Sequence, residues 1–213
     1  MIVNENLTTY IHSLESDNSP FLEELRVSAK ENDVPIIRRE TESFIKVLLS
    51  IKRPKKILEI GTAIGYSSIF MASCGENDIV TIENYEKRII EAEKNIKAAE
   101  MGNRIHLMKG DACEIIKTLE GSFDLIFLDA AKGQYIEMLP DLLRLLAPEG
   151  ILLADNVLQD GELTQSRFIT ERRQRTIHER MREFLWEVKH NETLETCVMT
   201  VGDGLSLSVR KNI

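Results

Sequence analysis

The chain has 213 residues, a hydrophobic content of 43% and a formal net charge of −8. This length allows one α/β domain with a large core. The negative net charge argues against a protein whose whole surface is basic for nucleic-acid binding, but it is compatible with a local basic patch. No apolar run approaches the length of a membrane span, and the first residues, MIVNENLTTY, lack the basic and apolar regions of a signal peptide, so we expect neither a membrane anchor nor secretion.

Residues 1–51 carry helical signals and no strand-like run. Asn18-Ser19-Pro20 opens the helical segment FLEELRVSAKEN, because proline is favoured in the first helical turn. Pro35 predicts a break, since the residue before a proline avoids helical geometry. The following segment, RRETESFIKVLLSIK, predicts a helix with one apolar face, formed by Phe44, Val47, Leu48 and Ile51.

From Lys55 onward, short apolar runs alternate with helical patterns. The runs are KKILEI, DIVTIE, RIHLMKG, FDLIFLD and ILLAD. Such alternation indicates right-handed βαβ crossovers and a doubly wound parallel sheet. LETCVMTV and GLSLSVRK then flank Gly202-Asp203-Gly204, a hairpin signal. We therefore expect a Rossmann-like α/β fold with a mostly parallel seven-stranded sheet, an antiparallel C-terminal hairpin and N-terminal helices.

The organisation predicted is a single domain over residues 1–213, with a helical cap in 1–51 and an α/β core in 52–213. We see no internal repeat or low-complexity segment. The cysteines are scattered, have no CxxC pair and are interpreted as small hydrophobic residues in a reducing cytoplasm. They are Cys74, Cys113 and Cys197.

Acidic and amide side chains end two of the predicted strands. Asp129 follows FDLIFL, and the pair Asp155-Asn156 follows ILLA 26 residues later. Parallel sheets collect ligands at the carboxyl ends of their strands. Two carboxylates and an amide oxygen suit a hard cation such as Mg²⁺ and do not suit zinc. The alternative is that each residue is an ordinary strand-end cap.

The first predicted strand runs into a loop with Gly61 and Gly65, where the backbone is able to approach a ligand closely. The helix that follows presents free N–H groups to an anionic group. The middle glycine of a dinucleotide fingerprint is replaced by Ala63. Glu83 ends the second strand 22 residues after Gly61, where an acid would accept hydrogen bonds from ribose hydroxyls. Its alternative role is a helix-start acid.

Five motifs occur along the chain in the order LEIGTAIGYSS, TIE, KGDA, FDLIFLDAAK and ADN. Together they resemble the cation-dependent class I O-methyltransferases, among them the catechol and caffeoyl-coenzyme A O-methyltransferases. The resemblance covers about residues 34–160 and the C-terminal VGDGLSLSVRK. It implies S-adenosylmethionine as methyl donor, a divalent cation, usually Mg²⁺, and a homodimer. Two segments look closer still to a bacterial subgroup that contains the tRNA 5-hydroxyuridine methyltransferases. They are VPIIRRETESFIKVLLSIKRPKKILEIGTAIGYS and LDAAKGQY.

The resemblance also implies a role for individual residues. Asp129, Asp155 and Asn156 match the metal ligands, and Lys132 matches the general base, for which the alternative is a surface helix lysine. A neighbouring dication would favour the neutral amine that a base must be. The cofactor-binding residues implied are Ile37, Glu59, Gly61, Ser67, Glu83, Asp111, Ala112 and Asp129.

One basic segment bears on the substrate. Residues 166–182 contain six arginines and two glutamates, a formal charge of +4 in an acidic chain. We expect this segment to contact a tRNA anticodon arm; its alternatives are a solvated helix face and a dimer contact. The arginines are Arg167, Arg172, Arg173, Arg175, Arg180 and Arg182.

Four functional hypotheses follow. The first is Mg²⁺-dependent methylation of 5-hydroxyuridine at the tRNA wobble position, and the second keeps the chemistry but takes a small catechol-like or hydroxycinnamoyl substrate. In either case the cation would bind two neighbouring substrate oxygens, so the metal site does not distinguish the two substrate classes. The third is an NAD-dependent oxidoreductase, against which Ala63 and the strand-end cluster argue. The fourth is a non-catalytic RNA-binding module, for which the metal ligands and lysine would be superfluous.

Overall fold

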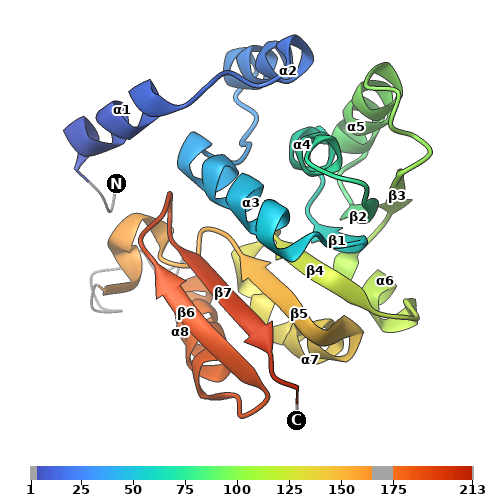
Figure 1. Ribbon diagram of the computed structural model, residues 1–213. Helices are drawn as coiled ribbons and strands as arrows, with labels where there is room; N and C mark the ends of the chain where they lie inside the picture. Colours follow the sequence, from blue (N-terminus) through green and yellow to red (C-terminus); the bar gives the residue numbers. More distant parts are fainter. Residues whose placement is uncertain (1–3, 165–174, 213) are drawn as a thin grey trace.

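A seven-stranded sheet forms the centre of the protein in this computed structural model, which describes residues 4–164 and 175–212 (Figure 1). The strand order is β3-β2-β1-β4-β5-β7-β6, and β7 pairs antiparallel with both of its neighbours while the other pairs are parallel. The strands are β1 (Lys56–Ile60), β2 (Asp78–Glu83), β3 (Ile105–Lys109), β4 (Phe123–Leu128), β5 (Leu146–Ala154), β6 (Leu194–Met199) and β7 (Leu205–Arg210). The predicted fold class is confirmed.

Helices cover both faces of this sheet. On one face α3, α4 and α5 pack against alternate residues of the central strands, with α2 beyond them; on the other lie α6, α7 and α8 (Figure 1). The helices are α1 (Glu5–Leu14), α2 (Pro20–Glu31), α3 (Arg39–Lys52), α4 (Tyr66–Ser73), α5 (Glu86–Ala98), α6 (Ala112–Thr118), α7 (Tyr135–Leu145) and α8 (Arg175–His190). Two short 3₁₀ helices are η1 (Lys132–Gln134) and η2 (Gln159–Thr164).

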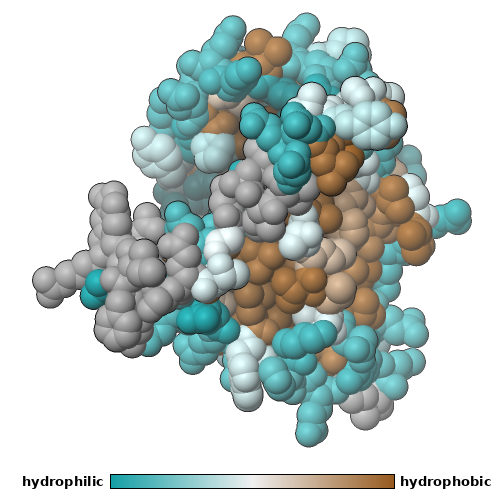
Figure 2. Space-filling model, turned by 90° about the vertical axis from the view of Figure 1, so that its left-hand side faces the viewer, coloured by the Kyte–Doolittle hydropathy of each residue, from teal (hydrophilic) through white to brown (hydrophobic). Residues whose placement is uncertain are grey.

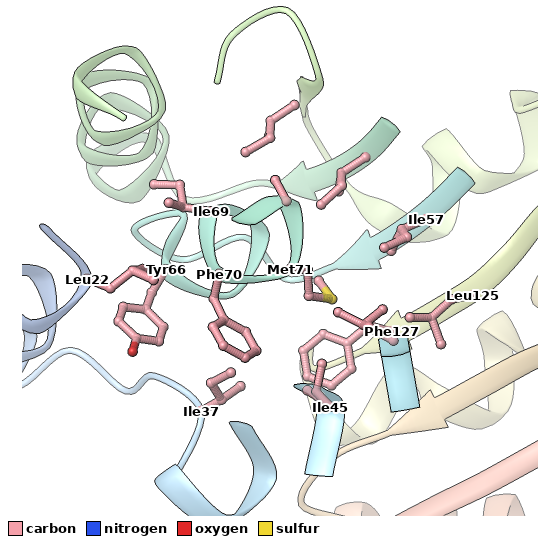
Figure 3. Packing of buried hydrophobic residues seen from close by; sticks show 14 of the residues in the cluster. Leu22, Ile37, Ile45, Ile57, Tyr66, Ile69, Phe70, Met71, Leu125 and Phe127 are labelled. Atoms are coloured by element: carbon pink, nitrogen blue, oxygen red, sulfur yellow. The ribbon is translucent and has the colours of Figure 1, made fainter. Parts of the chain in front are cut away.

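The central strands are buried on both faces, which explains why their sequences are continuous apolar runs. Leu125 and Phe127 of β4 face α3 and α4, whereas Ile126 and Leu128 face the other helix layer. Figure 3 shows the first layer, where side chains of α4 meet Ile45 of α3 and the strand residues beneath them. This packing holds the carboxyl ends of the strands in fixed positions.

Helix α2 begins where predicted, α1 precedes it without having been predicted, and α3 buries a different face from the one expected. Ser19 caps α2, which has Pro20 in its first turn, and α2 ends before Pro35. Helix α3, however, buries Ile45, Leu48 and Leu49, together with Thr41 and Glu42, while Val47 and Ile51 of the predicted face remain exposed. The prediction was right for Leu48 and wrong for Val47 and Ile51, because α3 is apolar over more than half its circumference and only tertiary packing selects the buried part.

Exposed apolar side chains gather on one side of the protein. Val47 and Ile51 of α3 are 58% and 76% exposed. Figure 2 shows apolar side chains across the middle of this side, with polar residues around them. A surface of this kind is typical of a contact with another molecule.

All three cysteines are free. Cys113 is buried and Cys74 half-buried, as expected of small hydrophobic residues, but Cys197 is exposed on β6. None of the helices in the described ranges combines the length and the apolarity needed to cross a bilayer.

Candidate active site

Three neighbouring strands end at the same level. The backbone N–H of Asp129, directly after β4, donates to the carbonyl oxygen of Ile60 at the end of β1 across 3.0 Å. The N–H of Asp155, directly after β5, donates to the carbonyl oxygen of Leu128 across 2.9 Å. Parallel pairing therefore brings Asp129 and Asp155 together, although 26 residues separate them in the chain.

A cavity of about 520 Å³ opens at this edge, a volume within the range of small-molecule sites. Most of its wall comes from loops that follow the strands, and the segment before α3 closes it on another side. The wall contains residues 35–38, 60–63, 66, 67, 83, 84, 110, 112, 129–132, 134, 155, 156 and 203.

Gly61 lies where the loop after β1 passes closest to Asp129. Its φ is +100°, and a Cβ at this position would lie 2.1 Å from the carbonyl oxygen of Asp129. Both the backbone conformation and the close approach require glycine. Gly65, with φ +83°, precedes the first turn of α4, so the loop ends at a helix N-terminus. The predicted glycine loop therefore lies beside the strand-end carboxylates.

Glu83 fastens this loop to the end of β2. One carboxylate oxygen accepts a hydrogen bond from the N–H of Ala63 at 2.8 Å, and the other accepts from the N–H groups of Asn84 at 3.0 Å and Tyr85 at 2.9 Å. Because these bonds orient the carboxylate on the cavity wall, it is positioned before any ligand arrives.

Glu59 does not line the cavity. It is fully buried behind the loop, where its carboxylate accepts hydrogen bonds from the hydroxyls of Ser68 and Thr81. Burial raises the pKa of Glu59 to about 7. Side chains alternate along β1, and the Glu59 side chain points toward α4, so the structure places this expected cofactor residue in a supporting position.

The other residues expected to bind a cofactor divide into two groups. Ile37, Gly61, Ser67, Glu83, Ala112 and Asp129 all lie on the cavity wall. Asp111 does not, because its side chain caps α6 by accepting a hydrogen bond from the N–H of Cys113 at 2.8 Å. Only its neighbours in the chain reach the wall.

Asp129, Asp155 and Asn156 lie on one part of the cavity wall. Asp155 is only 3% exposed, and its burial, with the nearby Asp129 carboxylate, raises the pKa of Asp155 well above its usual value. A buried carboxylate beside a second one is costly unless a cation offsets it, so this donor set fits a hard divalent cation. Among the described residues, no three or more His, Cys, Asp or Glu side chains are grouped so that they could hold a metal. The set here has only two carboxylates, and its third oxygen donor is the amide of Asn156.

Lys132 and Tyr135 lie beside these carboxylates. The Lys132 amine donates to Asp129 Oδ1 at 3.3 Å and is partly exposed on the cavity wall. The Tyr135 hydroxyl is fully buried and lies 3.1 Å from the carbonyl oxygen of Leu128 and 3.2 Å from that of Asp155. It joins the ends of β4 and β5 from behind.

Sequence reasoning missed Arg38 and Asp203, which both line the cavity. Arg38 immediately precedes α3 and forms an ion pair with Asp203, which lies in the turn between β6 and β7. The sequence assigns Gly202-Asp203-Gly204 to a hairpin turn and to the family resemblance, with no separate role for Asp203. The signal available was a charged residue between two glycines, and it does not reveal a partner far away in the chain.

The sequence model of the O-methyltransferase family matches residues 12–211. The chain belongs to this family. The family expected from the strand-end and loop motifs is therefore confirmed.

Individual members of the family give a similar result. The chain is 36% identical over 126 residues to a catechol O-methyltransferase from Niastella koreensis, with 56% of this chain and 57% of that protein covered. The matches to the first curated relatives span about half of their length, 57%, 55% and 50%.

Solved structures match over nearly the whole chain. A candidate caffeoyl-CoA O-methyltransferase from Staphylococcus aureus has a TM-score of 0.90 and 31% identity, and covers 97% of this chain and 100% of its own. An O-methyltransferase from Bacillus cereus, solved in complex with SAH, has a TM-score of 0.85 and 25% identity, and covers 97% of each chain.

Proposed function

We propose that the protein transfers a methyl group from S-adenosylmethionine to a hydroxyl oxygen with the help of a divalent cation. One observation carries this proposal: a single cavity joins a glycine loop and Glu83 to the pair Asp129 and Asp155. The first part suits a nucleoside-bearing donor and the second a hard cation. The SAH-bound structure from Bacillus cereus supports the same donor.

The cofactor would be held by groups that are already oriented. Glu83 would accept hydrogen bonds from the ribose hydroxyls, and the loop at Gly61 allows a close approach. Ser67, in the first turn of α4, would bind the methionine carboxylate beside free N–H groups. Binding S-adenosylmethionine supplies the electrophilic methyl group.

Asp129, Asp155 and Asn156 would hold the cation, which supplies positive charge that stabilises the substrate oxyanion. Lys132, on the same wall, would accept the proton of the attacking hydroxyl at Nζ. Tyr135 donates a hydrogen bond to the carbonyl oxygen of Asp155, and the segment 35–38 lines another side of the cavity. Together these residues would fix the oxygen in line with the methyl group.

For the substrate we propose 5-hydroxyuridine at the wobble position of tRNA, which becomes 5-methoxyuridine. The support is the basic segment, whose described part begins α8. Arg180 of α8 donates to the carbonyl oxygen of Gly133, next to Lys132, across 2.9 Å, so α8 adjoins the cavity rim. Arg175 and Arg182 lie on the same helix. Arg167, Arg172 and Arg173 lie outside the described residues.

The second candidate substrate is a small catechol-like or hydroxycinnamoyl molecule. It is favoured by the names of the relatives, a catechol O-methyltransferase and a candidate caffeoyl-CoA O-methyltransferase. Both substrate classes offer two neighbouring oxygens to a cation.

Methyl transfer from labelled S-adenosylmethionine would separate these candidates. We expect chelator-sensitive labelling of tRNA that carries 5-hydroxyuridine, and little labelling of a panel of catechols and caffeoyl esters. The reverse pattern would assign the small-molecule substrate. Activity on neither class, or activity that resists chelation, would contradict the proposal.

We also propose that the protein works as a homodimer in the cytoplasm. The exposed apolar side chains Val47 and Ile51 of α3 support the dimer, and the free cysteines agree with a reducing compartment. Sedimentation velocity of the parent and of Ile51→Glu would test the assembly. A monomeric parent would contradict it.

A further inference from the structure

The hairpin turn between β6 and β7 is part of the candidate active site. Asp203, in the middle of this turn, lies on the cavity wall. The turn is bonded to the residues directly after Asn156: the N–H of Leu158 donates to the carbonyl oxygen of Asp203 at 3.1 Å, and that of Val157 to Gly204 at 2.9 Å. The turn and the loop after β5 therefore form one unit.

The glycines on either side hold Asp203 in place. A Cβ on Gly204, whose φ is +94°, would lie 2.8 Å from the backbone nitrogen of Leu158. A Cβ on Gly202, whose φ is +56°, would lie 2.8 Å from the hydroxyl oxygen of Thr41. The turn thus contacts both the loop after β5 and the start of α3, and has little room to move.

The Asp203 carboxylate bridges two residues of the cavity wall. Oδ1 forms an ion pair with Arg38, and Oδ2 accepts a hydrogen bond from Nδ2 of Asn156 at 3.0 Å. A carboxylate accepts hydrogen bonds and, when ionised, donates none. Asn156 must therefore direct its NH₂ group toward Asp203, which leaves its Oδ1 as the side-chain atom available to a cation.

The backbone of Asn156 is already committed to this arrangement. Its φ is +57°, a left-handed conformation that is uncommon for residues other than glycine and is found at functional sites. Its N–H donates to Asp155 Oδ1 at 2.7 Å. With the backbone held, the remaining choice is which end of the carboxamide faces the cavity.

We propose that Asp203 is a positioning residue that makes this choice: it holds the Asn156 carboxamide so that oxygen, and not NH₂, faces the cation. The inference rests on the proposed cation binding at Asp129, Asp155 and Asn156. An NH₂ group turned toward a cation would repel it, so an unrestrained amide weakens the site. Through its ion pair with Arg38, Asp203 also joins the cation site to segment 35–38.

Binding of Mn²⁺ to the full, chelator-treated protein tests this inference without measuring activity. Free Mn²⁺ is counted by electron paramagnetic resonance, and affinity for S-adenosylhomocysteine is measured by calorimetry on the same samples. We expect Asp203→Ala to weaken Mn²⁺ binding roughly 10–100-fold, the usual effect of removing a residue that orients a metal ligand. Cofactor affinity is expected to stay within about twofold, because Gly61, Ser67 and Glu83, which would hold the cofactor, lie at the ends of β1 and β2 and in α4, and not in the turn of Asp203.

Two matched variants isolate the hydrogen bond. Asp203→Asn keeps an acceptor oxygen for Asn156 and is expected to restore most of the Mn²⁺ affinity. Asp141→Ala removes an aspartate that pairs with the exposed Arg144 on α7 and is expected to bind Mn²⁺ as the parent does. Should Asp203→Ala unfold, Asp203→Ser withdraws the carboxylate while keeping a polar turn residue, and carries the same expectation.

The outcomes separate the inference from the proposed function. A parent protein that binds no Mn²⁺ overturns the cation site itself. If the parent binds Mn²⁺ and the Asp203→Ala and Asp203→Ser variants bind it with the same affinity, only the role of Asp203 is overturned. An Asp203→Asn variant as weak as Asp203→Ala shows that charge and not amide orientation matters, and also overturns it.

Discussion

The carboxylate of Glu83 accepts a hydrogen bond from the backbone N–H of Ala63 at 2.8 Å. Glu83 ends β2 and Ala63 lies in the loop after β1, so the bond ties together the two strand ends that would hold a nucleoside. Ala63 has a φ of +47°, a conformation that this bond helps to maintain. One side chain thus shapes the loop and faces the cavity.

Glu83→Ala is expected to weaken S-adenosylhomocysteine binding at least about tenfold, or about 1.4 kcal/mol. It removes the acceptor for the ribose hydroxyls and also the bond to Ala63. Isothermal calorimetry measures the change. Glu83→Gln, which keeps one acceptor oxygen, should show a smaller decrease. Unchanged affinity in Glu83→Ala would reduce Glu83 to a helix-start residue.

Asp155→Ala is expected to abolish Mg²⁺-stimulated turnover and to leave cofactor affinity largely intact. Asp155 follows β5, whereas Glu83 ends β2 and Gly61 follows β1. Turnover at increasing Mg²⁺ and calorimetry with S-adenosylhomocysteine measure the two properties separately. Parallel loss of both would argue that the variant damages the whole cavity and not a cation site.

Lys132→Ala is expected to lower the catalytic rate roughly 10²–10⁴-fold, the usual contribution of a general base, with modest change in substrate affinity. The Lys132 amine adjoins Asp129, and its removal leaves both strand-end carboxylates in place. Rate constants at saturating substrate across a pH series measure the effect. A variant within a few-fold of the parent at every pH would show that the cation alone activates the hydroxyl.

Glu59 should make stability depend on pH. Because burial raises its pKa from 4.5 to about 7, the folded protein keeps a proton that the unfolded chain releases between these values. The free energy of unfolding should therefore fall as pH rises across this window, by about 3 kcal/mol at most.

Glu59→Gln mimics the protonated side chain and should flatten this dependence. Urea unfolding of cofactor-free protein at about pH 5 and about pH 8 measures it. Glu114→Gln, which alters an exposed pair with Lys117, is the matched control. If the free energy of unfolding changes with pH in Glu59→Gln as it does in the parent, the pH dependence belongs to other groups.

Replacing Arg172, Arg173 and Arg175 with alanine should weaken tRNA binding and flatten its salt dependence. The reason is the charge of +4 in residues 166–182 of an acidic chain. Each phosphate group that the variant no longer neutralises should change the logarithmic salt slope by about 0.7–0.9. Binding titrations at several salt concentrations measure it. An unchanged slope would favour a solvated helix face and strengthen the small-molecule alternative.

The predictable part of the site came from residues whose roles follow from their place next to a strand. Asp129, Asp155 and Glu83 each lie at the end of a strand, and Gly61 begins the turn after one. Because a parallel sheet gathers its carboxyl ends at one edge, apolar runs and the residues after them suffice to bring these groups together.

By itself the sequence determined the alternation of strands and helices, the glycine loop and the acidic strand ends, since each depends on neighbours within a few residues. Only the tertiary structure decided that Glu59 points away from the cavity, that α3 leaves Ile51 exposed, and that Asp203 binds Asn156. Those outcomes depend on contacts between elements far apart in the chain. The residues around Asp203 do not reveal that its partner is Asn156, 47 residues earlier. The two meet because β7 pairs antiparallel with β5.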